Sequence, residues 1–282
     1  LLASSAASDV YKRQAFAGAE KWVFADHLLN VPMATIATTP AEAKNIEKEK
    51  IDAAKPAFKA YAEALKFMTE HAAGLKGHAS RGPELINAAN YGYDQTVQMF
   101  ADGNALFIQQ GNWAYSNIEK INPETAKNVS FIPLKMPFTD EMIQDGRTAE
   151  QINSSIIVTT GNYYAINAKV SEEQQKQAVE FLKWMEKEEN VQKWIIDSFK
   201  FIPYNVTPEM KLENPLSESI QKYLSAGQTF NDTVVGTPKT WSGEKVGTAL
   251  LEQYIGKEEW DDETLDQIAD LCVNSWKELK SE

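Results

Sequence analysis

The sequence predicts an α/β fold, because short apolar segments with strand character alternate with amphipathic helices. A short buried strand is expected at Ala105 to Gln109, and the polar turn Gln110-Gly111-Asn112 ends it. A helical pattern begins directly afterwards at Trp113 and stops at Asn122-Pro123. A second apolar strand is expected from Val129 to Leu134. Open α/β sheets bind ligands where the carboxyl end of a strand turns into a helix, so we expect any binding site to centre on this stretch.

The composition argues against several classes of partner. The 282 residues include 28 Lys and Arg against 40 Asp and Glu, which gives a formal net charge of −12 and a pI of about 4.9. Nucleic acid and anionic membrane surfaces both select basic proteins, so neither is an expected partner. The single cysteine, Cys272, argues against a disulfide within the chain and against a thiolate metal cluster. No apolar run approaches the roughly 18 residues of a transmembrane helix.

The first part of the chain contains a tail and two expected helices. Residues 1–14 are small and polar, lack the apolar stretch of a signal peptide, and are interpreted as a tail or junction. Residues Ile51 to Ala73 place apolar side chains at helical spacing, with lysines and glutamates opposite, which predicts a helix. After Gly82-Pro83, a further helix is expected to carry three apolar side chains inward: Tyr93, Val97 and Phe100.

A polar loop, a long extended segment and a capped helix are expected in the middle of the chain. The loop runs from Thr139 to Asn153, and the extended segment from Ser154 to Lys169 is rich in β-branched and aromatic residues. Ser171 and Gln174 have the spacing of a capping box, which predicts a helix starting there. Its buried stripe is expected to contain Ala178, Phe181, Leu182 and Met185.

The C-terminal part is predicted to be mainly helical from Pro215 onward. Val234 to Trp241 is expected to be an extended link ahead of Ser242, a predicted N-cap. The last helix, from about Asp261 to Lys280, is expected to bury one face, made of Leu265, Ile268, Cys272, Trp276 and Leu279. Cys272 is therefore interpreted as a packing residue and not as the acylated cysteine of a lipoprotein.

The central stretch resembles a family signature. Gly103, Ala105, the segment Gln110-Gly111-Asn112-Trp113 and the later Phe131-Pro133-Leu134 resemble the pattern G-x-A-M-x-x-x-G-x-W … F-P-L of extracellular solute-binding proteins. The segment AVEFLKWMEKEENVQKW is similar to a second pattern of the same family. The resemblance covers about Ala15 to Glu282 and points to the carbohydrate-type receptors of ABC importers, which are similar to maltose-binding protein.

The resemblance implies a two-lobed periplasmic-binding-protein-like fold of type II. We expect this chain to be truncated at its N-terminus and to hold mainly the second lobe, with a returning segment of the first lobe. On that basis residues 15–158 are the first part of the second lobe, 159–214 are the crossover and the returning segment, and 215–282 are the C-terminal helices of the second lobe. Trp184 and Trp194, which lie in the second pattern, are expected to be structural.

The resemblance also implies the site residues. The tryptophan that matches Trp113 stacks on a sugar ring in the family, and a pyranose offers an apolar C–H face that suits a flat aromatic side chain. Composition alone leaves open whether Trp113 is instead a core residue. Aromatic or close-approach positions of the family match further residues of this chain, although Phe24 and His27 compete with Trp22. The predicted ligand-binding residues are Trp113, Trp241, Trp22, Tyr115, Gly161 and Asn162.

The expected function is non-catalytic binding of a sugar or oligosaccharide and its delivery to an ABC permease. No cofactor, metal site or nucleic-acid partner is expected, and the full-length protein is expected to be an extracytoplasmic monomer, membrane-anchored if it is a lipoprotein. One alternative is a receptor for iron or a polyol. Tyr163 and Tyr164 are adjacent, but neighbours in a strand point to opposite faces and do not share a metal. A glycoside-acting enzyme is less favoured, since no nucleophile or phosphate-binding motif is present.

Overall fold

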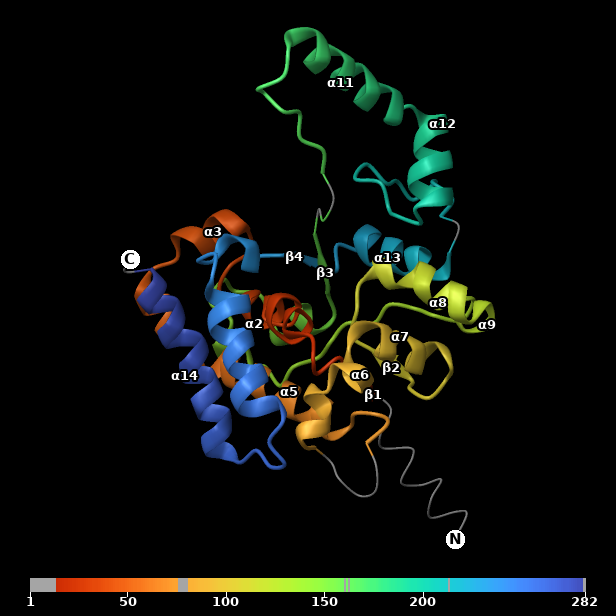
Figure 1. Ribbon diagram of the computed structural model, residues 1–282. Helices are drawn as coiled ribbons and strands as arrows, with labels where there is room; N and C mark the ends of the chain where they lie inside the picture. Colours follow the sequence, from red (N-terminus) through yellow and green to blue (C-terminus); the bar gives the residue numbers. More distant parts are fainter. Residues whose placement is uncertain (1–13, 76–80, 160, 162, 213, 281–282) are drawn as a thin grey trace.

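The computed structural model describes residues 14–75, 81–159, 161, 163–212 and 214–280, and helices dominate it (Figure 1). The α-helices are α2 (Asn30–Met33), α3 (Pro40–Asn45), α4 (Lys48–Ala53), α5 (Lys55–Glu70), α6 (Ala88–Tyr91), α7 (Tyr93–Ala101), α8 (Tyr115–Ile121), α9 (Pro123–Ala126), α10 (Ala149–Asn153), α11 (Glu172–Met185), α12 (Glu188–Asn190), α13 (Pro215–Ser225) and α14 (Asp262–Leu279). Wider, π-helical turns are η1 (Val23–His27), η5 (Val191–Ser198), η7 (Trp241–Gly247) and η8 (Leu250–Ile255). Short 3₁₀ turns are η2 (Pro83–Ile86), η3 (Asn112–Ala114), η4 (Asp140–Met142) and η6 (Val234–Gly236). None of the helices in the described ranges is long and apolar enough to cross a membrane.

The strands are few and form two separate parallel pairs. Strand β1 (Gln14–Ala15) pairs with β2 (Phe107–Ile108), and β3 (Ile156–Val158) pairs with β4 (Thr229–Asn231). The predicted strand at 105–109 is therefore present but shortened. The predicted strand at 129–134 is not formed, and the backbone of Phe131 instead exchanges two hydrogen bonds with the Ser219 hydroxyl. The described residues thus combine parallel strands with helices, as the α/β prediction has it, but helices dominate and the strands are few and short.

The main core lies between α5 and α14, which pack against each other. Helix α5 buries Phe58, Tyr61 and Leu65, and α14 buries Ile268, Cys272 and Trp276, as their helical spacing predicts. The Tyr61 hydroxyl donates to the Phe24 carbonyl at 2.8 Å, which ties η1 to this core. The prediction that Cys272 is a packing residue is confirmed by its complete burial.

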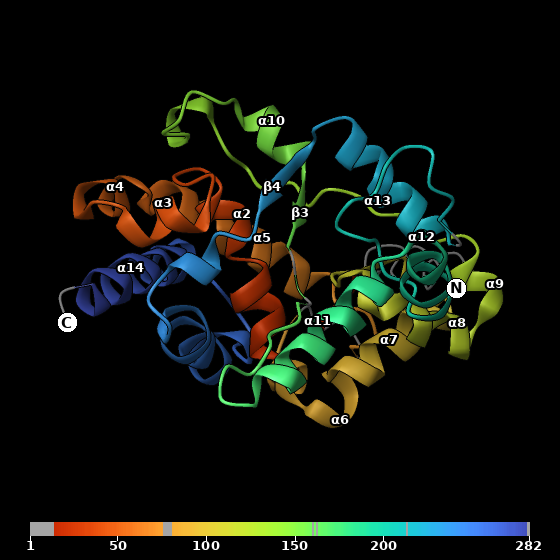
Figure 2. The ribbon, with the colours of Figure 1, turned by 90° about the horizontal axis from the view of Figure 1, so that it is seen from above.

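A second, smaller core joins α7, α8, α9 and α13 across β3. Its buried side chains are Val97, Ala101, Ala114, Tyr115, Ile118, Ala126, Val129, Ile156, Leu216 and Ile220. Figures 1 and 2 both place the pair β3–β4 between this group and the group that contains α3 and α14. The paired strands therefore connect the two cores.

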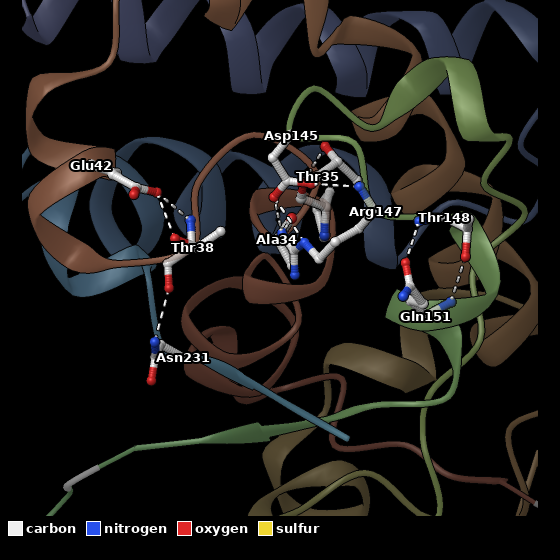
Figure 3. Close-up of polar contacts among 10 residues, drawn as sticks. Ala34, Thr35, Thr38, Glu42, Asp145, Arg147, Thr148, Gln151 and Asn231 are labelled. Atoms are coloured by element: carbon white, nitrogen blue, oxygen red, sulfur yellow. Dashed lines mark hydrogen bonds and ion pairs between the residues drawn. The ribbon is translucent and has the colours of Figure 1, made fainter. Parts of the chain in front are cut away.

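The segment 139–153, predicted to be a loop, contains η4 and α10 and is fastened to the main core (Figure 3). Arg147 pairs with Asp145 at 2.5 Å and donates to the Ala34 carbonyl, and the Gln144 N–H donates to the Thr35 carbonyl. A capping box of Thr148 and Gln151 begins α10. These contacts hold the segment against α2.

The end of β4 is held against the same part of the chain. The Asn231 side chain donates to the Thr38 carbonyl at 2.8 Å (Figure 3). The buried Asn30 side chain accepts from the N–H groups of Thr233 and Val234 at 2.8 and 3.0 Å. The chain after β4 consequently lies against η1 and α2.

The prediction of an extended link from Val234 to Trp241 is wrong in part. Residues Val234–Gly236 form η6, and Trp241 already begins η7. Ser242 is not an N-cap: it lies inside η7, where its hydroxyl donates to the Asp26 carboxylate at 2.5 Å. The tertiary contact to η1 replaces the local capping interaction that the sequence suggested.

Residues 163–212 form an arm that projects from the rest of the molecule (Figure 1). The predicted capping box of Ser171 and Gln174 begins α11 there. The predicted buried stripe is wrong in part: Met185 is buried as expected, but it is the one buried residue of α11, and Phe181 is 52% exposed. The ring of Phe181 stacks on that of Trp184, itself 40% exposed, at 5.9 Å. No described element packs over these rings, which is why helical spacing alone misjudged their burial.

Candidate functional site

Four ring side chains from three parts of the chain meet beside the carboxyl end of β2. We call Trp22, His27, Tyr93 and Trp113 the aromatic cluster. The ring centroids of Trp22 and His27 lie 4.9 Å apart, those of His27 and Trp113 5.0 Å, and those of Trp22 and Trp113 6.4 Å. Tyr93 lies 6.0 Å from Trp22. The structure thus brings together Trp113 and Trp22, two of the residues that the sequence predicted for the site.

The position of Trp113 follows from the turn after β2. Its ring lies so close to Gly111 that a Cβ atom on Gly111 would stand 2.0 Å from the ring. The Trp113 indole N–H donates to Gln110 Oε1 at 3.3 Å, and 40% of the side chain stays exposed. The close approach of the Trp113 ring therefore requires a glycine at position 111. In this position, part of the ring remains exposed to solvent.

Trp22 is held by Glu20. The Trp22 indole N–H donates to one carboxylate oxygen of Glu20 at 2.9 Å, and the other oxygen accepts from the Tyr93 N–H at 3.1 Å. Tyr93 is the first residue of α7, so this carboxylate stands at a helix N-terminus, where negative charge is favourable. Glu20 thereby fixes Trp22 and α7 relative to each other.

His27 is the most buried titratable group in the cluster. Burial lowers its pKa from the ordinary value of 6.5, while the negative charges of Asp232 and Asp26 act in the opposite direction. A neutral imidazole offers one donor and one acceptor. The carboxylate atom Oδ1 of Asp232 is buried and has no hydrogen-bond partner in the structure.

A large pocket of about 1060 Å³ opens next to the cluster. His27 and Trp113 line it, together with apolar side chains such as Leu106, Phe107 and Ile132, each at least half exposed. The pocket also contains polar side chains from the turn after β2, namely Gln109, Gln110 and Asn112. A concave, mostly apolar surface with a few polar groups is typical of small-molecule sites.

Two atoms of that turn are buried without a partner: Gln109 Oε1 and Gln110 Nε2. Neither glutamine is among the residues predicted from the sequence, although Gln110 stands three residues before Trp113 in the family signature. His27 competed with Trp22 for a family position in the sequence but is not among the predicted site residues. Its ring contacts with Trp22 and Trp113 place His27 in the site. The contact with Trp113 joins residues far apart in the sequence, so no local sequence pattern could predict it.

Two predicted site residues lie in the cores instead. Trp241 has no exposed surface, and its indole N–H donates to the Cys272 carbonyl at 2.9 Å. Tyr115 is 4% exposed and belongs to the second core. Both assignments are therefore corrected, because neither ring presents a surface to a ligand. Phe58 of α5 and Trp276 of α14 pack on Trp241, and Tyr115 belongs to the core that α7 and α8 share.

The remaining predicted residues directly precede the arm in the sequence. Gly161 is exposed and outside the pocket, and a Cβ atom there would meet just the Thr159 methyl group at 4.0 Å. Asn162 lies outside the described residues. Tyr163 and Tyr164 are 81% and 61% exposed. Across the described ranges, no group of three or more His, Cys, Asp or Glu side chains is placed to hold a metal ion.

Comparison with protein families identifies the chain. The model of the bacterial extracellular solute-binding proteins matches residues 10–243, which include β2, the aromatic cluster and the arm. The chain belongs to this family. Membership indicates a periplasmic-binding-protein-like fold, an extracytoplasmic location and solute binding for ABC transport, in a family that is generally not enzymatic. Among curated proteins, no sequence matches the chain.

Proposed function

We propose that this solute-binding protein takes up a sugar or oligosaccharide in the pocket beside the aromatic cluster and delivers it to the permease of an ABC importer. The observation that carries the proposal is the half-open ring of Trp113 at the pocket wall. A sugar ring has an apolar C–H face and a rim of hydroxyl groups, so it suits an aromatic plane with polar groups beside it.

The chemistry of the pocket favours a neutral ligand over an ion. Its polar groups in the turn after β2 are the uncharged amides of Gln109, Gln110 and Asn112, and its two charged lining residues, Glu63 and Lys135, are of opposite sign. Polyols share the hydroxyl chemistry but lack the flat C–H face, which makes them the weaker candidate. Iron is disfavoured because the adjacent tyrosines, Tyr163 and Tyr164, point to no carboxylate or histidine cluster among the described residues.

We further propose that the arm belongs to a first lobe, and that the body belongs to the second. The exposed, stacked rings of Phe181 and Trp184 support this assignment, since an apolar face of this kind is usually covered by another surface. Closure of two lobes over the pocket would bury the ligand and give the permease a distinct bound form. Gly161, just before the arm, would then lie at the crossover between the lobes.

The direct test is a binding screen on the native protein that carries this chain. Calorimetry measures the binding of methyl glycosides of glucose, galactose, mannose and xylose, and of maltose and xylo-oligosaccharides. Mannitol and ferric citrate are titrated separately, to test the alternative polyol and iron ligands. We expect saturable binding of at least one sugar, with a change in tryptophan fluorescence. Binding of ferric iron or mannitol alone, or release of cleaved sugar, would contradict the proposal.

A further inference from the structure

Gln109 and Gln110 present one acceptor and one donor that the protein itself leaves unpaired. Gln109 Oε1 and Gln110 Nε2 are both buried and make no hydrogen bond, and both side chains line the pocket. Buried polar groups are nearly always paired, because desolvation without a partner is unfavourable. Two such atoms on neighbouring residues, beside the exposed Trp113 ring, are therefore a property of the site that calls for an explanation.

The orientation of the Gln110 amide is fixed by its neighbour. Its oxygen accepts the indole N–H of Trp113 at 3.3 Å, so its –NH₂ group is the end directed away from that bond. The unpaired atom is consequently a donor. At Gln109 the unpaired atom is the carbonyl oxygen, an acceptor.

The two atoms together select a particular ligand chemistry. A hydroxyl group both donates and accepts, so two adjacent hydroxyls can donate to Gln109 Oε1 and accept from Gln110 Nε2. A carboxylate would face the Gln109 oxygen, and an ammonium group would face the Gln110 –NH₂. A neutral ligand with neighbouring hydroxyls satisfies both atoms.

We propose that Gln109 and Gln110 form a donor–acceptor pair that recognises two adjacent hydroxyl groups of a sugar ring stacked on Trp113. This inference rests on the proposed function, and it names the residues that determine which sugar is preferred. Both atoms are covered in the structure, so a ligand must turn the Gln109 amide about its terminal torsion, which is broad in glutamine, while the Gln110 amide keeps its bond to Trp113. The bond from Trp113 to Gln110 also couples the stacking ring to the polar contact.

The test combines two variants with ligand analogues. Gln110→Glu keeps an acceptor for the Trp113 indole and removes the donor, and Gln109→Leu removes the acceptor. Each is titrated, by calorimetry on the native protein, with the methyl glycoside that the wild type binds most tightly and with its 2-, 3-, 4- and 6-deoxy forms. Gln267→Leu, on the exposed face of α14, is the matched control.

We expect each variant to lose about ten- to a hundredfold in affinity, at an unchanged melting temperature, with Gln267→Leu like the wild type. The loss should be absent with one particular deoxy sugar, because the hydroxyl that Gln109 or Gln110 contacts is already missing. Wild-type affinity in both variants, or equal losses for every deoxy form, would overturn this inference alone. Failure of every glycoside to bind the wild type would overturn the proposed function as well.

Discussion

Trp113 and Trp241 occupy two regions that look alike in sequence and differ in structure. Each lies at the start of a helical segment, Trp113 as the second residue of η3 and Trp241 as the first residue of η7. Trp241 packs against Trp276 and Phe58, at ring distances of 4.9 and 6.0 Å, and is completely buried. Trp113 contacts His27 and Trp22 on one side and remains 40% exposed. The comparison shows that the partners contributed by distant helices decide whether such a ring is core or site.

The largest effect is expected at Trp241. Trp241→Ala removes a fully buried ring between α5 and α14 and the hydrogen bond from its indole to the Cys272 carbonyl. We expect a loss of about 3–5 kcal/mol in the free energy of unfolding, measured by urea denaturation. A stability within about 1 kcal/mol of the wild type would show that Trp241 is not core and would reopen its assignment as a site residue.

Sequence reasoning succeeded where a local pattern decides the structure. The helices α5, α11 and α14 follow from apolar spacing and capping residues, and the position of Trp113 after β2 follows from the turn at Gly111. Strand pairing was not predictable, because β1 and β3 find their partners about 90 and 70 residues away. The stripe of α11 was misjudged because periodicity identifies an apolar face but not the surface that covers it.

The same limit applied to the site. Trp241 and Tyr115 were selected by resemblance, and both are buried, Trp241 by rings from α5 and α14 and Tyr115 in the second core. His27 and Gln109 were not selected, since their roles depend on the contact between η1 and the turn after β2. Asn162 lies outside the described residues, and its role remains a prediction.

Gly111→Ala tests the difference between Trp113 and Trp241, because it should displace the Trp113 ring and leave Trp241 unchanged. The added methyl group would collide with the indole ring, which must then turn away from its present position. We expect sugar affinity to fall about tenfold or more, with little change in melting temperature, because the ring is half exposed. Calorimetric titration together with a melting curve tests this, and an unchanged affinity would mean that the ring position does not matter for binding.

The arm provides a third tryptophan environment. Phe181 and Trp184 are as exposed as Trp113 but lie outside the pocket. The double substitution Phe181→Ser and Trp184→Gln should reduce binding of a hydrophobic dye and self-association of the isolated chain. Dye fluorescence and light scattering measure both. Equal dye binding before and after the substitutions would show that the arm is not the source of the exposed apolar surface.

The smallest expected effect is a pH dependence of the protein's stability that arises from His27. Burial lowers its pKa in the folded protein below the ordinary 6.5, so on acidification the unfolded chain takes up the proton first. The contribution of the neutral ring is complete above about pH 6.5 and is lost as the pH falls toward the folded-state pKa. Melting temperatures from pH 7.5 to 5.5 should decline more steeply for the wild type than for His27→Gln. Parallel curves would contradict this assignment.

The central claim is that Trp113 is the sugar platform, and one paired measurement tests it most directly. Trp113→Ala and Trp184→Ala each remove a ring that is 40% exposed, but the first lines the pocket and the second lies on the arm. Calorimetric titration of the native protein with its tightest-binding methyl glycoside is combined with a melting curve for each variant. We expect Trp113→Ala to abolish or greatly weaken binding at a nearly unchanged melting temperature, while Trp184→Ala binds like the wild type. Unchanged affinity in Trp113→Ala, with a large drop in melting temperature, would contradict the claim and make Trp113 a core residue.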